Sequence, residues 1–127
     1  MPDEAVMASV YSVIGEEGFG QLVAAFYRQV PTDDLLGPMY PPQELAAAER
    51  RLRDFLIYRF GGPQRYIAER GHPRLRMRHA PFAIPSAARN RWVALMDRAI
   101  HEVGLPPQVV AIMQPFLAET ATVLING

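Results

Sequence analysis

The chain has 127 residues, no cysteine, and thirteen basic residues balanced by thirteen acidic ones, and half of its residues are apolar. A net charge of zero gives no general attraction for nucleic acid, and no apolar run reaches the roughly 18 residues of a membrane span. Without thiols, a disulfide framework, an iron–sulfur cluster and a thiolate zinc site are excluded. The acidic start, MPDEAVMASV, lacks the basic residues of a secretory signal, so we expect one compact cytoplasmic domain.

Helical periodicity interrupted by proline clusters predicts an all-α domain that spans residues 1–127. The first helix is expected from about Asp3 to Ile14 and ends near Gly15. A second is expected from about Gly18 to Val30. The polar run Thr32-Asp33-Asp34 then predicts the cap of a short turn.

The middle of the chain contains the clearest predicted helix. It begins at Pro42, where a proline suits the first helical turn, and it ends at Gly61-Gly62-Pro63. A short helical piece is expected around Arg65 to Glu69. After it, Arg74 to His79 can form about one and a half turns between prolines.

Two further helices are predicted near the C-terminus. Ser86 has the side chain of an N-cap residue, and Gly104 is suited to close that helix. The prolines at 106–107 open the last helix, which is expected to continue to about Ile125. Because Pro115 lies inside it, we expect a kink or a loosened turn there.

The three histidines are the candidate ligands for a metal or a haem iron. His101 lies near the end of a predicted helix and His72 precedes a proline, so both are interpreted as surface or loop groups. His79 is followed by APFAI, which gives its imidazole apolar surroundings. Haem iron needs one neutral imidazole, held by packing, on its proximal side. A lone histidine in an apolar setting is also a common core residue, and the residues alone leave both interpretations open.

The segment GHPRLRMRHAPF, residues 71–82, resembles the proximal region of the group II truncated globins. The branch it resembles is that of the mycobacterial oxygen-avid truncated haemoglobin. Trp92 lies at the family's set distance beyond His79. The likeness continues in register over nearly all the chain: FYRQV at 26–30, MYP at 39–41, AERRLRDFL at 48–56, GGP at 61–63 and RNRWVALM at 89–96.

This resemblance implies an all-α truncated globin fold, in which two helix pairs stack two over two around haem b. His79 matches the family's proximal histidine, the only protein ligand to the iron. Tyr27 matches the distal tyrosine, Tyr40 the aromatic residue after the short turn, and Trp92 the tryptophan of the distal pocket. The resemblance therefore implies that Tyr27, Tyr40 and Trp92 position the bound ligand.

The resemblance also implies which residues surround the haem. Ala48 occupies the site where many globins place a distal histidine, and Leu52 is expected to cover the distal face one turn later. Arg51 and Arg78 match the family's partners of the haem propionates. The residues expected to contact haem are Arg51, Leu52, Phe55, Leu75, Arg78, His79, Phe82, Trp92 and Met96.

Two features depart from the family pattern. The family has paired glycines after the first helix, whereas here Gly15 is followed by Glu16, with Gly18 and Gly20 nearby. The hinge is therefore expected to be shifted or extended. The second departure is Pro115 in the last helix, and neither change affects a residue predicted around the iron.

On residue type alone, Tyr27, Tyr40 and Trp92 would each be assigned to the core, with their polar atoms satisfied by backbone. The resemblance reverses this preference, because three donors around one apolar pocket can stabilise a bound diatomic ligand that has anionic character. A hydrogen bond to such a group contributes roughly 1.5–3 kcal/mol, which slows oxygen release about tenfold or more.

The predicted function is binding of dioxygen and other diatomic ligands at ferrous iron, with slow oxygen release. Two uses stay open. One is an enzyme, a nitric oxide dioxygenase or weak peroxidase supplied by an electron donor that the sequence does not identify. The other is a sensor or store without turnover. A haem-free helical interaction module is a third interpretation, and a homodimer is compatible with the sequence.

Overall fold

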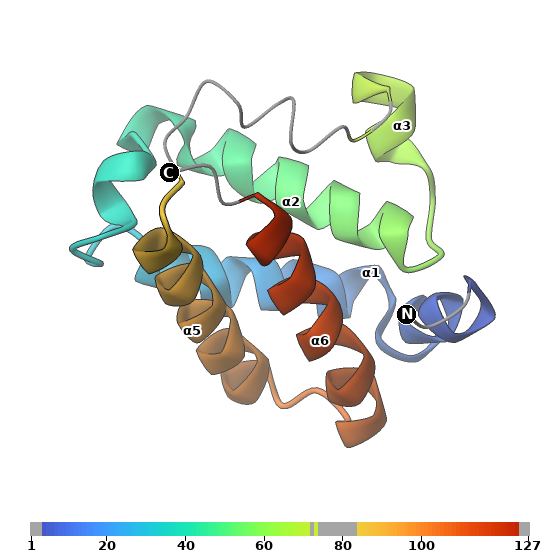
Figure 1. The fold of residues 1–127 in the computed structure, drawn as a ribbon. Coiled ribbons are helices and arrows are strands. Elements are labelled where there is room, and N and C mark those ends of the chain that lie inside the picture. The colour runs from blue at the N-terminus through green and yellow to red at the C-terminus, as the bar shows by residue number, and fades with distance from the viewer. Residues whose placement is uncertain (1–3, 72, 74–83, 125–127) are drawn as a thin grey trace.

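The computed structural model describes residues 4–71, 73 and 84–124, and every regular element in these ranges is helical (Figure 1). Four long helices dominate: α1 (Glu4–Gln29), α2 (Leu45–Arg59), α5 (Ser86–Val103) and α6 (Pro107–Val123). Helix α1 packs against α2, and it also contacts α5 and α6, which pack against each other. The predicted all-α class is therefore confirmed, and α1 joins the two halves of the molecule.

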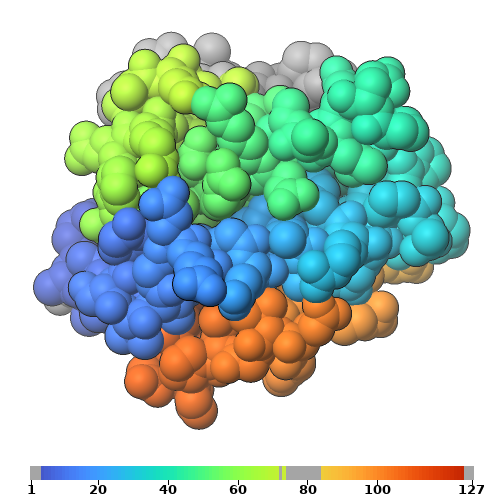
Figure 2. Space-filling view, turned by 180° about the vertical axis from the view of Figure 1, so that it is seen from behind, coloured from blue at the N-terminus to red at the C-terminus, as the bar shows by residue number. Residues whose placement is uncertain are grey.

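Seen from behind, the surface of α1 forms a band across the molecule (Figure 2). Side chains of α2 and of α3 (Arg65–Arg70) lie on one side of this band, and the connection between α5 and α6 lies on the other. In the described ranges, no helix combines the length and the apolar character needed to cross a membrane.

Helix α1 contains a break at Gly15, where the backbone has φ 63° and ψ −176°. A positive φ is strained for a residue with a Cβ atom, whereas glycine adopts it readily. The break falls where the sequence predicts the first helix to end, so the expectation of two helices is confirmed. Within α1 the non-helical φ and ψ are confined to Gly15, so the expected extension of the hinge toward Gly18 and Gly20 is wrong.

The end of α2 approaches the first part of α1 very closely. A Cβ atom added at Gly61, whose φ is 90°, would lie 2.7 Å from the Cα atom of Ala8. One added at Gly62 would lie 2.5 Å from the ring of Tyr11. Only glycine fits both places, which gives a structural reason for the GGP sequence that ends the helix.

The connection from α1 to α2 consists of two short 3₁₀ helices, η1 (Gly37–Met39) and η2 (Pro42–Glu44). One oxygen of Asp33, Oδ2, accepts hydrogen bonds from the backbone N–H groups of Leu35 and Leu36, at 3.1 and 2.8 Å. The predicted cap of the turn is therefore confirmed. The helix predicted from Pro42 is also confirmed, with a 3₁₀ first turn before α2.

Helix α5 begins at Ser86, but the prediction that Ser86 is its N-cap is wrong. The capping position belongs to Pro85, which has φ −77° and ψ 167°, and no side chain caps the helix. Proline already holds the extended conformation that an N-cap residue adopts, so the helix starts with Ser86 as its first residue. The predicted end is confirmed, because Gly104 is left-handed with φ 74° and ψ 44°.

The structure also tests the predictions for the short helix after Gly61-Gly62-Pro63 and for the last helix. Helix α3 (Arg65–Arg70) matches the predicted short piece. Helix α6 continues through Pro115, which is exposed, so this proline does not end the helix. The predicted turns at 74–79 and the predicted end at Ile125 lie outside the described residues.

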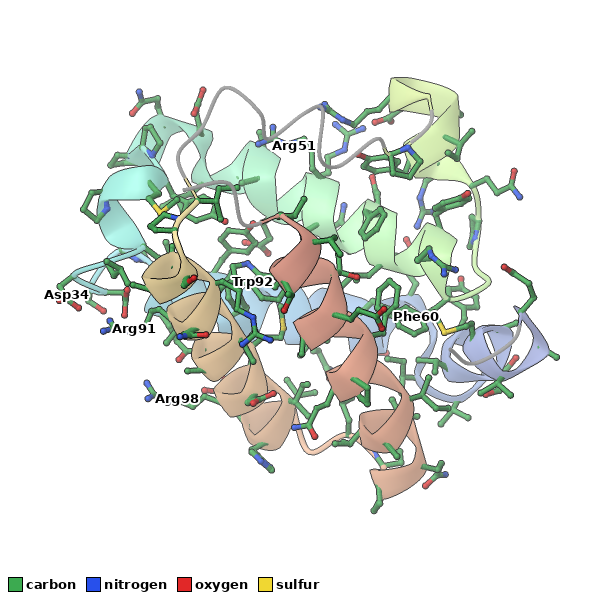
Figure 3. All side chains as sticks on the ribbon, viewed as in Figure 1. Asp34, Arg51, Phe60, Arg91, Trp92 and Arg98 are labelled. Carbon is green, nitrogen blue, oxygen red and sulfur yellow. The ribbon has the colours of Figure 1, made fainter. Side chains whose placement is uncertain are left out.

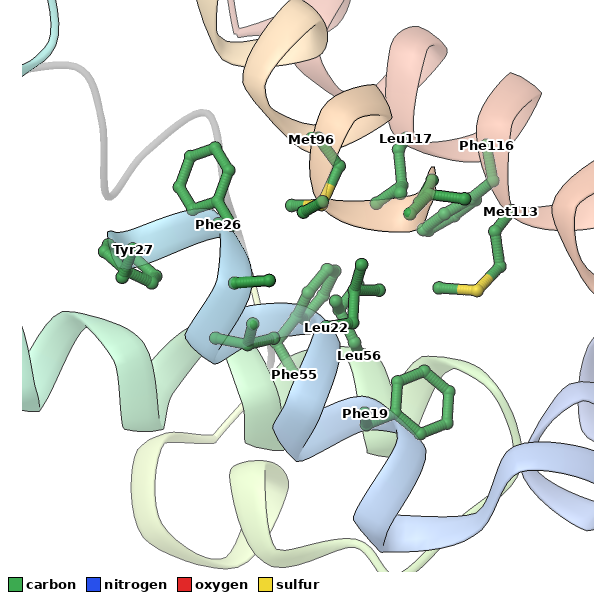
Figure 4. Packing of buried hydrophobic residues seen from close by; sticks show 14 of the residues in the cluster. Phe19, Leu22, Phe26, Tyr27, Phe55, Leu56, Met96, Met113, Phe116 and Leu117 are labelled. Carbon is green, nitrogen blue, oxygen red and sulfur yellow. The ribbon is translucent and has the colours of Figure 1, made fainter. Parts of the chain in front are cut away.

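Buried side chains from α1, α2, α5 and α6 form one apolar core (Figure 4). The Phe60 ring lies 5.8 Å from that of Phe19 and 5.2 Å from that of Phe116, which joins α1, the end of α2 and α6. Each fully buried large apolar side chain contributes about 1.5–3 kcal/mol relative to an exposed one. Such side chains include Phe19, Leu22, Phe26, Leu56, Ile57, Phe60, Met96, Ile100 and Met113.

Candidate functional site

Three aromatic residues with polar atoms meet at the end of the core away from Phe60. Tyr27 comes from the last part of α1, Tyr40 follows η1, and Trp92 comes from the first part of α5. The rings of Tyr27 and Tyr40 meet edge to face at 5.6 Å. Phe26 packs against both Tyr27, at 4.9 Å, and Trp92, at 5.3 Å. The structure thus brings together the three residues predicted to position a ligand.

Hydrogen bonds connect all three polar groups. The hydroxyl groups of Tyr27 and Tyr40 are hydrogen-bonded to each other, and the indole of Trp92 is hydrogen-bonded to Tyr40. Indole N–H is a donor only, so the Tyr40 oxygen accepts from Trp92. Because their hydrogen bond raises the pKa of Tyr27 and lowers that of Tyr40, we infer that Tyr27 is the donor. These two bonds use both lone pairs of the Tyr40 oxygen, and the Tyr40 proton takes part in neither bond.

Both tyrosines keep their protons at neutral pH. Burial raises the pKa of Tyr27 far above the ordinary 10.0, and the neighbouring Tyr40 hydroxyl adds to this. Burial also raises the pKa of Tyr40, against the opposing effects of the bonds from Tyr27 and Trp92. The positive charge of Arg51 opposes the increase at both tyrosines. Both hydroxyls are therefore neutral, and each keeps the proton with which it can donate one hydrogen bond.

Helix α2 provides the apolar side chains predicted for the distal face. Ala48 and Phe55 are buried, and Leu52 is partly buried against the core cluster. Positions 48, 52 and 55 fall on one helix face because they follow i, i+4, i+7 spacing. The predicted stripe is therefore present on α2. Met96, also predicted to contact haem, is fully buried in the core (Figure 4).

Arg51, the predicted propionate partner, is exposed on α2. Its positive charge acts on Tyr27 and Tyr40, so Arg51 lies close enough to both hydroxyls to affect their pKa values. An exposed guanidinium beside an apolar region suits a carboxylate that points to solvent.

The other predicted haem contacts lie outside the described residues. These are His79, the predicted iron ligand, together with Leu75, Arg78 and Phe82. The one histidine that the structure describes, His101, is exposed in the last turn of α5, as predicted. Within the described part of the chain, no group of three or more His, Cys, Asp or Glu side chains could hold a metal ion.

Arg50 and Arg53 join an ionic cluster on the outer side of α2. Asp54, which is buried, lies 3.8 Å from Arg50, 3.6 Å from Arg53 and 3.8 Å from Arg65. Arg50 also bonds Glu69 on α3, at 2.5 Å. The ion pairs of this cluster tie α3 to α2.

Sequence reasoning missed Arg91 entirely. Its guanidinium lies 2.7 Å from Asp33 and 2.8 Å from Asp34, across the gap from α5 to the turn after α1. Figure 3 shows Arg91 and Asp34 at the outer edge, whereas Trp92 lies toward the interior. No local sequence pattern marks Arg91 as the partner of a carboxylate, because Asp33 and Asp34 lie far from it in the sequence. The only available signal was the adjacent pair Asp33-Asp34.

Known proteins with similar sequences and structures are globins. Residues 9–125 match the family described as bacterial-like globin. A group 2 truncated haemoglobin from Bacillus subtilis is 38% identical over 116 residues, 91% of this chain and 87% of that protein. The structure of a truncated oxygen-avid haemoglobin from Bacillus subtilis has a TM-score of 0.87 and 38% identity, covering 92% of this chain and 98% of that one. A thermostable haemoglobin from the actinobacterium Thermobifida fusca has a TM-score of 0.88 and 42% identity, covering 92% and 96%.

Proposed function

The chain belongs to the bacterial-like globin family and is homologous to the group 2 truncated haemoglobins, and on this basis we propose that it binds dioxygen and other diatomic ligands and releases oxygen slowly. Family membership implies haem. We propose that the group is haem b, that His79 ligates its iron, and that the chain is nearest in function to the mycobacterial branch. The similar truncated haemoglobin from Bacillus subtilis is oxygen-avid, which supports slow release.

The described residues fit a haem in their chemistry. Leu52 and Phe55 supply apolar surface, and Arg51 supplies an exposed positive charge for a propionate. Tyr40 and Trp92, which also pack against the core cluster, supply polar atoms. An apolar pocket with a few placed donors is typical of cofactor sites. The bound haem supplies the ferrous iron at which a diatomic ligand binds.

The observation that carries the proposal is that the Tyr40 hydroxyl is hydrogen-bonded to both Trp92 and Tyr27. Trp92 and Tyr27 both donate to its oxygen, so the Tyr40 proton is the donor that remains for a ligand. In this arrangement Tyr40 donates to the ligand, while Trp92 and Tyr27 orient the Tyr40 hydroxyl. Burial keeps that hydroxyl protonated and limits the water that would compete for it.

Replacing Tyr40 by Phe tests this assignment. The change removes the proposed donor but keeps the ring, so oxygen dissociation measured by stopped flow is expected to accelerate about tenfold or more. Trp92→Phe is expected to accelerate it by a smaller factor, because only the orientation of Tyr40 is lost. Tyr58→Phe, the same substitution at a partly buried tyrosine of α2 outside the aromatic group, serves as the control. An unchanged rate in Tyr40→Phe would show that its hydroxyl does not contact the ligand.

Slow oxygen release serves either turnover or storage. A ligand held by a neutral donor in a water-poor pocket suits reaction with nitric oxide or peroxide, and we propose this use with an electron donor of unknown identity. Steady-state nitric oxide consumption, measured with a reductase supplied, distinguishes an enzyme from a sensor or store. Sustained consumption supports the enzyme, and a single stoichiometric reaction without turnover supports a sensor or store.

A further inference from the structure

The carboxylate of Asp33 connects the turn after α1 to α5. Its Oδ2 accepts the backbone N–H groups of Leu35 and Leu36, and its Oδ1 lies 2.7 Å from the Arg91 guanidinium. The same guanidinium lies 2.8 Å from Asp34. The Asp33 side chain is 9% exposed, against 88% for that of Asp34. Water therefore screens the pair with Asp34 more strongly, and Asp33 is the main partner of Arg91.

Consecutive backbone hydrogen bonds make the turn from Asp33 to Tyr40 one unit. The N–H of Gly37 donates to the carbonyl of Asp33 at 2.9 Å, and that of Tyr40 donates to the carbonyl of Gly37 at 3.2 Å. Between them, the N–H of Met39 donates to the carbonyl of Leu36 at 2.9 Å. The Leu36 side chain is buried in the core. A displacement of Asp33 is therefore passed to Tyr40.

Arg91 and Trp92 are neighbours on α5 that face different surroundings (Figure 3). Arg91 contacts the start of the turn at Asp33, and Trp92 donates to Tyr40 at its end. The outer ion pair and the inner hydrogen bond thus link the same two parts of the chain. Arg91 and Trp92 are adjacent residues of one rigid helix. Loss of the Arg91 ion pair therefore changes the distance between the Trp92 indole and the Tyr40 hydroxyl.

We propose that Arg91 is a positioning residue, whose ion pair with Asp33 holds the turn at the distance from α5 where the Trp92 indole reaches the Tyr40 hydroxyl. The inference deepens the proposed function and rests on it wherever ligand release is measured, because Tyr40 is the proposed donor to the ligand. Arg91 is 37% exposed, and Asp33 keeps its two backbone hydrogen bonds when Arg91 is removed, so we expect the ion pair to add little to stability. Loss of Arg91 therefore changes the orientation of Tyr40 more than it changes folding.

A second link between α1 and α5 provides a matched control. Gln29 donates to the carbonyl of Leu95 at 2.9 Å, and Arg98 contacts the Gln29 side chain at 3.5 Å. Arg98 lies two helical turns after Arg91 and on the same face of α5. Its contact reaches α1 itself and not the turn that carries Tyr40. Arg98→Met therefore makes the same substitution on the same face of α5 and removes a contact to α1, without affecting the proposed positioning.

The test uses the fact that Trp92 is the single tryptophan of the chain. Its indole N–H gives one resonance in the nitrogen-15 NMR spectrum of the ferrous carbon monoxide complex, and also in the haem-free protein. Arg91→Met is expected to shift this resonance and to speed its exchange with solvent, while Arg98→Met leaves both unchanged. Oxygen dissociation is expected to accelerate about two- to tenfold in Arg91→Met, less than in Tyr40→Phe.

Asp33→Asn separates the ion pair from the turn cap. The amide oxygen can still accept from the backbone of Leu35 and Leu36, whereas the charge that holds Arg91 is lost. Asp33→Asn is expected to reproduce the effect of Arg91→Met. The double variant Asp33→Asn/Arg91→Met is expected to show no larger effect than either single variant. Arg91→Lys keeps the positive charge and is expected to restore part of the wild-type behaviour. Additive effects would contradict a shared role.

Failure of this inference and failure of the proposed function are distinguishable. An unchanged indole resonance in Arg91→Met overturns the positioning role and leaves haem and ligand binding unaffected. A wild-type protein that takes up no haem overturns the proposed function, while the resonance of the haem-free protein still tests the link from Arg91 to Trp92.

Discussion

At the residue scale, the Tyr40 oxygen is the point at which the hydrogen bonds of Tyr27, Tyr40 and Trp92 meet. It accepts hydrogen bonds from Trp92 on α5 and from Tyr27 on α1, so two helices and the connecting turn define its orientation. Sequence resemblance identified these three residues, but it gave no direction to their hydrogen bonds. Donor and acceptor roles depend on where the side chains meet, which no local pattern encodes.

Tyr27 is expected to make the stability of the fold sensitive to alkali. Its pKa is raised in the folded protein, chiefly by burial, so the unfolded chain loses this proton first. The stabilising contribution is fully present below pH 10 and decreases as pH rises above it, by about 1.4 kcal/mol per pH unit for one tyrosine. Urea unfolding midpoints at stepwise pH measure this, and Tyr27→Phe is expected to show a shallower decrease. Equal slopes in the two proteins would contradict the assignment.

At the element scale, glycines mark the predicted boundaries that the structure confirms. Gly15 breaks α1, Gly61 ends the α2 region, and Gly104 closes α5. These predictions succeeded because a positive φ is a local requirement, which a single residue type satisfies. The N-cap prediction at Ser86 failed because the preceding proline already occupies the capping conformation. Serine side chains cap well, but only at the position that the backbone assigns to the cap.

The close approach of Gly61 to α1 gives a stability prediction at this scale. Gly61→Ala places a Cβ atom 2.7 Å from Ala8 at a positive φ, so we expect a loss of about 1–3 kcal/mol in the free energy of unfolding. Gly20→Ala is the control, because it adds a methyl group to a helix where nothing lies within 4 Å. That variant is expected to gain about 0.5–1 kcal/mol. Urea denaturation measures both, and an unaffected Gly61→Ala would contradict the close contact.

At the scale of the whole molecule, the core has two different ends. The end around Phe60 is filled by aromatic rings of the chain itself. The end around Trp92 combines rings with polar atoms that point toward one another. This asymmetry is expected of a domain whose proposed haem completes one part of the interior. Ligand binding to the folded state alone also raises its stability.

His79→Ala tests the proposed haem ligand at this scale. The variant is expected to lose most of its haem during purification and to lack the Soret band of the wild-type protein, because a single imidazole holds the iron. Its thermal midpoint is expected to fall to that of the haem-free wild-type protein. His101→Ala, which changes an exposed histidine of α5, is expected to retain haem. Full haem occupancy with an unchanged spectrum in His79→Ala would contradict the assignment.

By itself, the sequence determined the helical class, most helix boundaries and the family, because periodicity, prolines and glycines act within a few residues of each other. It also identified Tyr27, Tyr40 and Trp92, through their register in the resemblance. Only the tertiary structure decided which of them are hydrogen-bonded to each other, because that depends on the packing of α1, α5 and the turn. It alone revealed Arg91, because an ion pair between residues distant in the chain exists only after the helices have come together.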